Sequence, residues 1–94
     1  MVYISGKITG NENYEKQFNE AERELKKMGY EVFNPARIKE NWSYEDYMKF
    51  DIKHLLECEQ IYLLPNWEDS KGARLEKQIA ETVGISTLEL KWIK

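Results

Sequence analysis

The chain has 94 residues, 41% of them hydrophobic and 33% charged, with a formal net charge of −3. This length and composition predict one folded domain over residues 1–94 and exclude a mainly disordered chain, because the apolar content can offset the entropy lost on folding. The small excess of acidic groups argues against duplex nucleic acid as a partner, since such binding needs a surplus of cations.

The first part of the chain carries a strand signal followed by a helix signal. The apolar run 2–4 predicts a short buried strand, which the glycine-containing loop 5–10 closes. Apolar residues then recur every three or four positions over residues 13–28, so we expect an amphipathic helix with Met28 at the end of its buried stripe. Gly29 is placed to terminate that helix.

The middle of the chain repeats this alternation. Residues 30–33 predict a second strand, and Pro35 stops it because proline cannot donate to a ladder. Ser43 is a suitable cap for a helix that is expected to run to about Cys58. The apolar run 61–64 predicts the third strand.

The last part of the chain completes the pattern. Loop 65–72 leads into a third long helix, whose predicted buried side includes Leu75 and Val83 and which Gly84 ends. Residues 85–90 predict a fourth strand. Strands that alternate with helices in this way indicate an α/β fold with parallel strands joined by right-handed crossovers.

Ligands of open parallel sheets bind beyond the carboxyl ends of the strands, which here are loops 5–10, 34–42 and 65–72. Near this edge two acids interrupt apolar helix stripes. Asp51 lies in the stripe of the second long helix, and Glu76 lies beside the stripe of the third. A buried carboxylate needs a partner or an opening to a cleft, because its desolvation is costly.

The two acids have two interpretations. An inward pair of carboxyl groups at this edge is typical of glycoside chemistry, in which one acts as the nucleophile and another group handles the proton. The alternative is structural, with Asp51 bonded to Arg74, a loop amide or a tyrosine hydroxyl, and with Glu76 in the same ion-pair network.

Two loops at the same edge carry groups suited to an anion. Glycines let backbone N–H groups approach a ligand, although the same residues also suit a tight turn and a helix cap. The sequence matches neither the Walker motif nor the dinucleotide fingerprint, so ATP and NAD are disfavoured. The candidate anion-binding residues are Ser5, Gly6, Lys7, Thr9, Gly10, Ser70 and Gly72.

Aromatic residues lie near these loops as well. Trp42 and Trp67 are placed to cover a base or a sugar, or simply to pack on the rim of the sheet. Tyr3 in the first strand points either into the core or toward the strand end. His54 and Cys58 are interpreted as structural, because no other cysteine accompanies them to form a disulfide or a zinc site.

No metal or cofactor is therefore predicted. The amino-terminal residues lack the apolar stretch of a signal peptide or a membrane span, so we expect a cytoplasmic protein without membrane association.

Four runs of the sequence carry a family resemblance. They are YISGKITG at residues 3–10, GYEVFNP at 29–35, Trp42 with the Tyr47–Met48 pair before Asp51, and LLPNWEDSKGARLE at 63–76. With these runs the sequence resembles the nucleoside 2-deoxyribosyltransferase superfamily, and more closely its branch known as domain of unknown function 4406. The resemblance implies a Rossmann-like, flavodoxin-like sheet of about four parallel strands with helices on both faces.

The resemblance also implies an activity, the cleavage of an N-glycosidic bond through a covalent sugar–enzyme intermediate. By this resemblance Glu76 corresponds to the nucleophile, Tyr3 holds its carboxylate, and Asp51 serves the proton and the leaving base. Ser70 stands where members that act on free nucleosides have an aspartate, which implies a 2′-deoxynucleoside 5′-monophosphate as the small-molecule substrate, for hydrolysis or for transfer. The resemblance further implies a homodimer or a higher homo-oligomer.

The sequence departs from the active relatives at two places. Lys77 and Gln78 stand where they have a hydrophobic residue and a glycine, and Thr9 replaces a loop arginine. These departures keep a second hypothesis open, a non-catalytic nucleotide-binding protein that acts as a sensor or a sponge through the same pocket. A structural domain with internally paired acids is the third.

Overall fold

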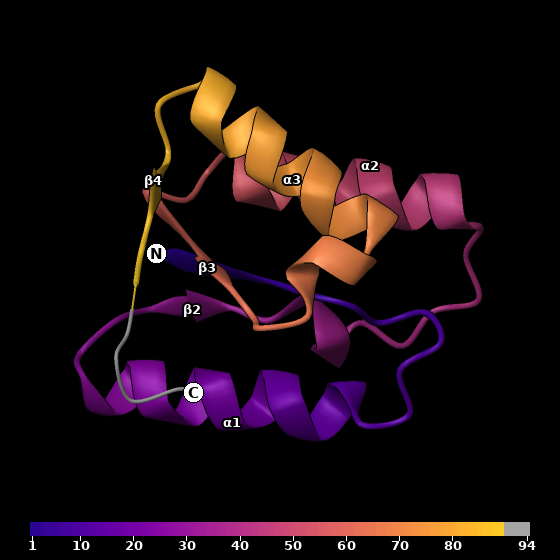
Figure 1. Ribbon diagram of the computed structural model, residues 1–94, viewed down its shortest axis with the longest axis horizontal. Coiled ribbons are helices and arrows are strands. Elements are labelled where there is room, and N and C mark those ends of the chain that lie inside the picture. Colours follow the sequence, from indigo (N-terminus) through magenta and orange to yellow (C-terminus); the bar gives the residue numbers. More distant parts are fainter. Residues whose placement is uncertain (90–94) are drawn as a thin grey trace.

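The computed structural model describes residues 1–89 as three layers, with a parallel sheet between helices (Figure 1). The strand order is β2-β1-β3-β4, and α1 covers one face while α2 and α3 cover the other. This confirms the predicted α/β, Rossmann-like sheet of four parallel strands with helices on both faces. In chain order the elements are β1 (Val2–Ser5), α1 (Tyr14–Lys27), β2 (Val32–Phe33), the 3-10 helix η1 (Pro35–Arg37), α2 (Tyr44–Leu55), β3 (Gln60–Leu63), the 3-10 helix η2 (Trp67–Asp69), α3 (Lys71–Thr82) and β4 (Ser86–Thr87).

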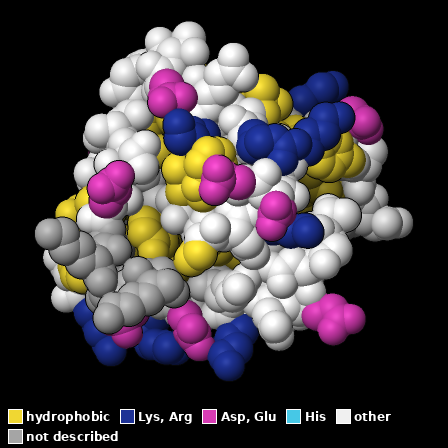
Figure 2. Space-filling view, in the orientation of Figure 1, with side chains coloured by type: hydrophobic (Ala, Val, Ile, Leu, Met, Phe, Trp, Pro, Cys, Tyr) yellow, Lys and Arg dark blue, Asp and Glu magenta, His cyan; other side chains and the backbone are white. Residues whose placement is uncertain are grey.

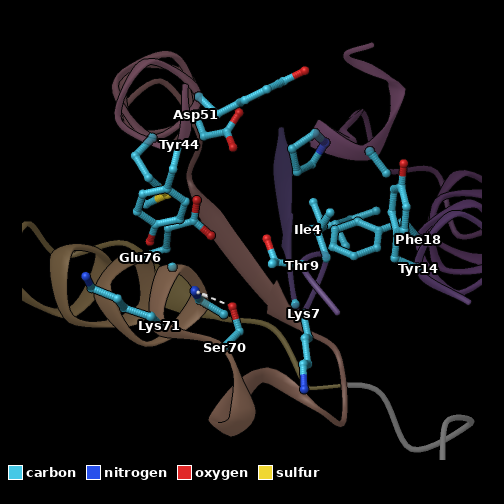
Figure 3. A pocket seen from close by; sticks show the side chains of 18 of the residues that line it. Ile4, Lys7, Thr9, Tyr14, Phe18, Tyr44, Asp51, Ser70, Lys71 and Glu76 are labelled. Atoms are coloured by element: carbon cyan, nitrogen blue, oxygen red, sulfur yellow. Dashed lines mark hydrogen bonds between the residues drawn. The ribbon is translucent and has the colours of Figure 1, made fainter. Parts of the chain in front are cut away.

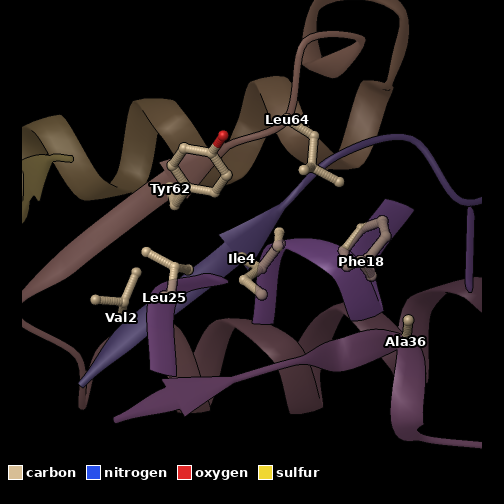
Figure 4. Packing of buried hydrophobic residues seen from close by; sticks show 8 residues of the cluster. Val2, Ile4, Phe18, Leu25, Ala36, Tyr62 and Leu64 are labelled. Atoms are coloured by element: carbon tan, nitrogen blue, oxygen red, sulfur yellow. The ribbon is translucent and has the colours of Figure 1, made fainter. Parts of the chain in front are cut away.

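Strand β1 is the centre of the fold and divides the interior into two cores. It pairs with β2 on one side and with β3 on the other, and all four of its residues are buried. Val2 and Ile4 pack with Phe18 and Leu25 of α1 (Figure 4). Successive side chains of a strand point to opposite faces. Tyr3 and Ser5 therefore face α2 and α3 instead. The core on that side contains Tyr3, Leu55, Cys58, Ile61, Ala80 and Ile85.

Serine caps set the starts of α2 and α3. The Ser43 hydroxyl accepts a hydrogen bond from the backbone N–H of Asp46, and the Ser70 hydroxyl accepts one from Ala73, both at 3.1 Å. These bonds satisfy backbone donors that the first turn of a helix leaves unpaired. Gly84 follows α3 with a φ of 81°, a left-handed conformation that suits glycine. The boundaries predicted at Ser43 and Gly84 are confirmed, whereas α3 begins at Lys71, inside the predicted loop 65–72.

Three residues predicted in buried helix stripes are exposed, and these predictions are wrong. Met28, Leu75 and Val83 expose 50%, 42% and 53% of their surfaces. Helix α3 contacts the sheet through the small residues Ala73 and Ala80, so the wider apolar stripe extends past the contact. Met28 and Val83 are the cap residues that follow the last helical residues of α1 and α3.

Two strands and one helix are shorter than predicted. Strand β2 begins at Val32, which pairs with Val2 at the start of β1, so of residues 30–31 only the Glu31 carbonyl reaches β1, accepting a hydrogen bond from Val2 at 2.7 Å. Strand β4 comprises only Ser86–Thr87 of the predicted 85–90, and residue 90 lies outside the described part of the chain. Helix α2 ends at Leu55, three residues before the predicted end.

The described surface carries charges of both signs. Lysine, arginine and acidic side chains are interspersed over the face that Figure 2 shows, with hydrophobic side chains among them. Within residues 1–89, no helix combines the length and the apolar character that crossing a bilayer requires.

A buried acid ties α1 to the segment after β2. Glu22 is 4% exposed and accepts hydrogen bonds from Nε of Arg37 at 2.7 Å and Nδ2 of Asn34 at 2.9 Å. Nζ of Lys26 forms a salt bridge with its other oxygen at 2.7 Å. Burial acts to raise the pKa of Glu22, but the three donors outweigh it and lower the pKa to about 2.

Substituting Glu22 with glutamine is expected to lower the free energy of unfolding by about 2 kcal/mol at pH 7, because two cations lose their buried partner. A depressed pKa contributes stability above the unfolded value and loses it as the pH falls toward 2. Urea denaturation of both proteins from pH 2 to pH 8 measures this. The difference should shrink below pH 4; a difference that does not vary with pH would contradict the ion-pair role.

Candidate functional site

A cavity of about 630 Å³ lies at the carboxyl end of β1, the edge of the sheet where the sequence predicts a ligand. Its wall is built from the β1 loop, the start of α1, the segment around η1, α2, and the start of α3. Figure 3 shows these elements arranged around one open space. The lining residues are Tyr3, Ile4, Gly6, Lys7, Ile8, Thr9, Tyr14, Phe18, Pro35, Ala36, Ile38, Trp42, Tyr44, Tyr47, Met48, Asp51, Asp69, Ser70, Lys71, Gly72, Ala73 and Glu76.

Glu76 extends from α3 onto the face of β1 and is 5% exposed. The Tyr3 hydroxyl donates to Oε2 of Glu76 at 2.6 Å, and the Ser5 hydroxyl donates to Oε1 at 2.7 Å. Both donors lie on the same face of β1 because they are two residues apart. Each carboxyl oxygen of Glu76 therefore has one buried hydroxyl donor.

Opposing effects set the ionisation of Glu76. Burial raises its pKa to about 7, because the charged form loses its hydration. The hydrogen bonds from Tyr3 and Ser5 favour the charged form and lower the pKa, whereas the negative charge of Asp51 raises it further. Burial also raises the pKa of Tyr3 well above its usual range, so its hydroxyl keeps its proton and remains a donor.

Asp51 reaches the same cavity from α2 and lies above Glu76 in Figure 3. It is 8% exposed, and its buried Oδ1 has no hydrogen-bond partner among the described residues. Burial raises its pKa to about 7. A buried oxygen without a partner that lines a cavity is placed to bond a ligand.

The partners that the structural alternative requires bond elsewhere. Arg74 donates to the backbone carbonyl of Glu68, and the Tyr47 hydroxyl bonds to the main chain of Glu40. Within residues 1–89, neither acid of the cavity forms a salt bridge. The ion-pair network considered from the sequence is therefore not present in the described part of the chain.

The candidate anion-binding residues divide into two groups. Gly6, Lys7, Thr9, Ser70 and Gly72 line the cavity. Ser5 lies behind Glu76 and does not line it, and Gly10 lies outside the lining too.

Close packing explains two of the glycines in the lining. A Cβ on Gly6 would lie 2.7 Å from Cδ1 of Leu64, and a Cβ on Gly72 would lie 3.2 Å from Sδ of Met48. Glycine thus lets the β1 loop approach the end of β3, and it lets the first turn of α3 approach α2. Both positions leave backbone N–H groups near the cavity without a side chain over them.

The two tryptophans differ in position. Trp42 lines the cavity and packs against the rings of Tyr47 at 5.1 Å and Phe50 at 5.2 Å. Trp67 lies outside the lining, with the ammonium of Lys77 5.4 Å from its ring centre.

The two residues interpreted as structural lie in packed surroundings. The His54 ring stacks on Phe33 with centroids 4.5 Å apart, and Cys58 is a buried free thiol. Within residues 1–89 no three histidine, cysteine or acidic side chains are grouped so as to hold a metal ion.

The part of the sequence that forms the cavity matches a known protein family. Residues 1–89 match the sequence model of a family described as a domain of unknown function, DUF4406. The chain belongs to the DUF4406 family. No curated protein and no solved structure gives a significant match. All lining residues lie between positions 3 and 76, so the whole cavity is part of the DUF4406 domain.

Several lining residues of this DUF4406 chain were not predicted from the sequence. One apolar wall comes from the start of α1 and from η1, and includes Tyr14, Phe18 and Pro35. Their apolar character signals a core as readily as a cavity wall. Lys71 also lines the cavity; its position directly after the cap Ser70 was the available signal, because a cation there accompanies the N–H groups of the first helical turn.

Proposed function

We propose that this DUF4406 protein cleaves the N-glycosidic bond of a 2′-deoxynucleoside 5′-monophosphate through a covalent sugar intermediate on Glu76. The observation that carries the proposal is the pair of buried acids in one cavity, Glu76 held by two hydroxyls and Asp51 with an unpartnered oxygen. The resemblance to the nucleoside 2-deoxyribosyltransferase superfamily, residue by residue at these positions, supports the same assignment.

The surroundings of the two acids suit a nucleophile and a proton donor. The reaction needs one ionised and one protonated carboxyl group at the same time. Both acids have a pKa raised to about 7, but only Glu76 receives hydrogen bonds that favour its charged form. The proposed reaction uses the state in which Glu76 is ionised and Asp51 holds the proton, where the leaving base needs it.

The proposed reaction has two steps. The ionised Glu76 attacks C1′ of the sugar, the C1′–N bond breaks, and protonated Asp51 gives its proton to the departing base. Asp51, now ionised, then takes a proton from water as the water oxygen bonds to C1′. The ester bond between C1′ and Glu76 breaks in that step, which restores the starting carboxylate and releases 2-deoxyribose 5-phosphate; a second base in place of water gives transfer.

The lower end of the cavity in Figure 3 suits the 5′-phosphate. Ser70 and Gly72 begin α3, whose first N–H groups and positive helix end attract an anion. Lys7, Thr9 and Lys71 add two cations and a hydroxyl to the lining. A neutral serine at position 70 suits a dianion better than a carboxylate would, because it adds no repulsion.

A non-catalytic nucleotide binder is the second candidate, and the departure at Lys77 motivates it. The Lys77 ammonium forms a salt bridge with Glu81 at 3.0 Å and lies over the ring of Trp67. Lys77 does not line the cavity, so this departure leaves the surroundings of Glu76 open to substrate. The geometry therefore favours the enzyme.

Intact-protein mass spectrometry tests the proposal directly. We expect incubation with pooled 2′-deoxynucleoside 5′-monophosphates to release free base and to add one deoxyribose phosphate to the protein, on the peptide that contains Glu76. Rapid acid quenching preserves the ester for detection. Nucleotide that binds and is recovered unchanged would support the binder instead; neither binding nor adduct would reject both functions.

A further inference from the structure

The hydroxyl of Ser5 is directed at the nucleophile and away from the space that a substrate would occupy. Ser5 ends β1, is 1% exposed, and donates to Oε1 of Glu76 at 2.7 Å. Its backbone carbonyl accepts a hydrogen bond from the N–H of Leu64 at 2.8 Å, and the residue pairs with Leu63 of β3. The donor is thus carried on a fixed central strand.

We propose that Ser5 is a positioning residue that works with Tyr3 to hold Glu76 ionised and oriented for attack, and that it does not contact the substrate phosphate. This inference rests on the function proposed above and reassigns a residue that the sequence placed with the phosphate-binding loop.

Two observations separate this role from phosphate binding. Ser5 does not line the cavity, whereas Glu76, to which its hydroxyl donates, does. A serine hydroxyl has a single proton to donate, and here Glu76 receives it. A bond from Ser5 to a phosphate would therefore leave Oε1 of the nucleophile without its donor.

The hydroxyls of Tyr3 and Ser5 oppose the effects that would protonate Glu76. Burial and the nearby charge of Asp51 on α2 both disfavour the carboxylate. On the sheet side Tyr3 and Ser5 are the groups that face it, and no cation among the described residues is bonded to it. The two hydroxyls fix the carboxyl group through both oxygens, which also restricts its rotation before attack.

The test compares the full-length wild type with Ser5→Ala by carbon-13 NMR titration of the glutamate carboxyl groups, with the Glu76 signal assigned from Glu76→Gln. Loss of one hydrogen bond to a charged group is expected to raise the pKa of Glu76 by about one unit. The same variant is expected to show about tenfold lower kcat/KM for base release on the acid side of the pH profile, with KM changed less than about twofold.

Two further variants make the result specific. Ser5→Cys keeps a weak donor and should give an intermediate pKa for Glu76. Ser43→Ala removes the hydroxyl that caps α2, outside the cavity, and should lower stability without moving the pKa of Glu76. Should Ser5→Ala fail to fold, the titration of Ser5→Cys decides alone.

An unchanged pKa of Glu76 in a folded Ser5 variant would overturn the inference. A raised KM with an unchanged pH profile would do so as well, because it would indicate a contact to the substrate. A wild type that releases no base would reject the proposed function instead, while the NMR titration would still report whether Ser5 holds the carboxylate.

Discussion

Replacing Glu76 with glutamine is expected to reduce base release by about four orders of magnitude or more, because the amide cannot form the ester with C1′. Glutamine keeps nearly the same shape, and its oxygen still accepts a hydrogen bond from Tyr3 or Ser5. The fold and the cavity should therefore persist. Base release is measured by chromatography under single-turnover conditions, with nucleotide binding followed by calorimetry.

Glu81→Gln is the matched control for this substitution. Glu81 lies on the same helix, but it is exposed and forms only a surface salt bridge with Lys77. Its substitution should leave the rate within about twofold, since exposed ion pairs contribute little. If Glu76→Gln retained the rate of the wild type while remaining folded, the covalent mechanism would be wrong.

Replacing Asp51 with asparagine is expected to lower base release about 10²- to 10⁴-fold, the usual contribution of a general acid. Asparagine cannot supply a proton to the leaving base. A deoxyribose 5-phosphate derivative whose leaving group departs without protonation should therefore release that group in the first turnover nearly as fast with Asp51→Asn as with the wild type. Equal losses for both substrates would contradict the role of Asp51 as the acid.

The pH dependence should separate the two roles. Base release by the wild type is expected to peak near neutral pH, since Glu76 must lose its proton and Asp51 must keep one. Both pKa values are raised to about 7, and the two limbs of the profile belong to the pair. Asp51→Asn should lose the alkaline limb and keep the acid one.

The contribution of Asp51 to the free energy of unfolding varies with pH in the opposite sense to that of Glu22. The pKa of Asp51 is raised from 3.8 to about 7 by burial, so the folded state holds this proton more tightly than the unfolded state. The tighter binding of this proton stabilises the folded state near pH 4, and this stabilisation is lost as the pH rises through 7. Urea denaturation is therefore expected to show Asp51→Asn more stable than the wild type by about 4 kcal/mol at pH 8, with little difference at pH 4.

The start of α2 and the parallel α/β arrangement could be predicted from the sequence, whereas the strand order β2-β1-β3-β4 was not predicted. Ser43 and Ser70 carry capping hydroxyls, and the alternation of strands with helices leaves few topologies. Strand lengths could not be predicted from the sequence, since the two-residue β2 is limited by where β1 begins. The exposure of Leu75 depends on how closely Ala73 and Ala80 let α3 approach the sheet, which helical periodicity does not contain.

The candidate site could be predicted from the sequence to a similar degree. Asp51 and Glu76 interrupt apolar stripes, so the sequence alone placed both acids inward, and the structure brings them to one cavity. The bonds from Tyr3 and Ser5 to Glu76 were not predictable from the pattern. Both faces of β1 are buried, so hydrophobicity along the strand does not tell which side α3 covers.

The alternation along β1 has a consequence for how this domain tolerates change. Two buried acids on one side of the strand, each with a pKa raised to about 7, reduce stability at neutral pH, as functional sites commonly do. On the other side Val2 packs with Ala21 and Leu25 of α1, and these three residues do not line the cavity, whereas Ile4 and Phe18 of the same core do. Tighter packing around Val2, Ala21 and Leu25 would raise the stability of the fold without contact with either acid, so substitutions there can offset the stability cost of the two buried carboxyl groups.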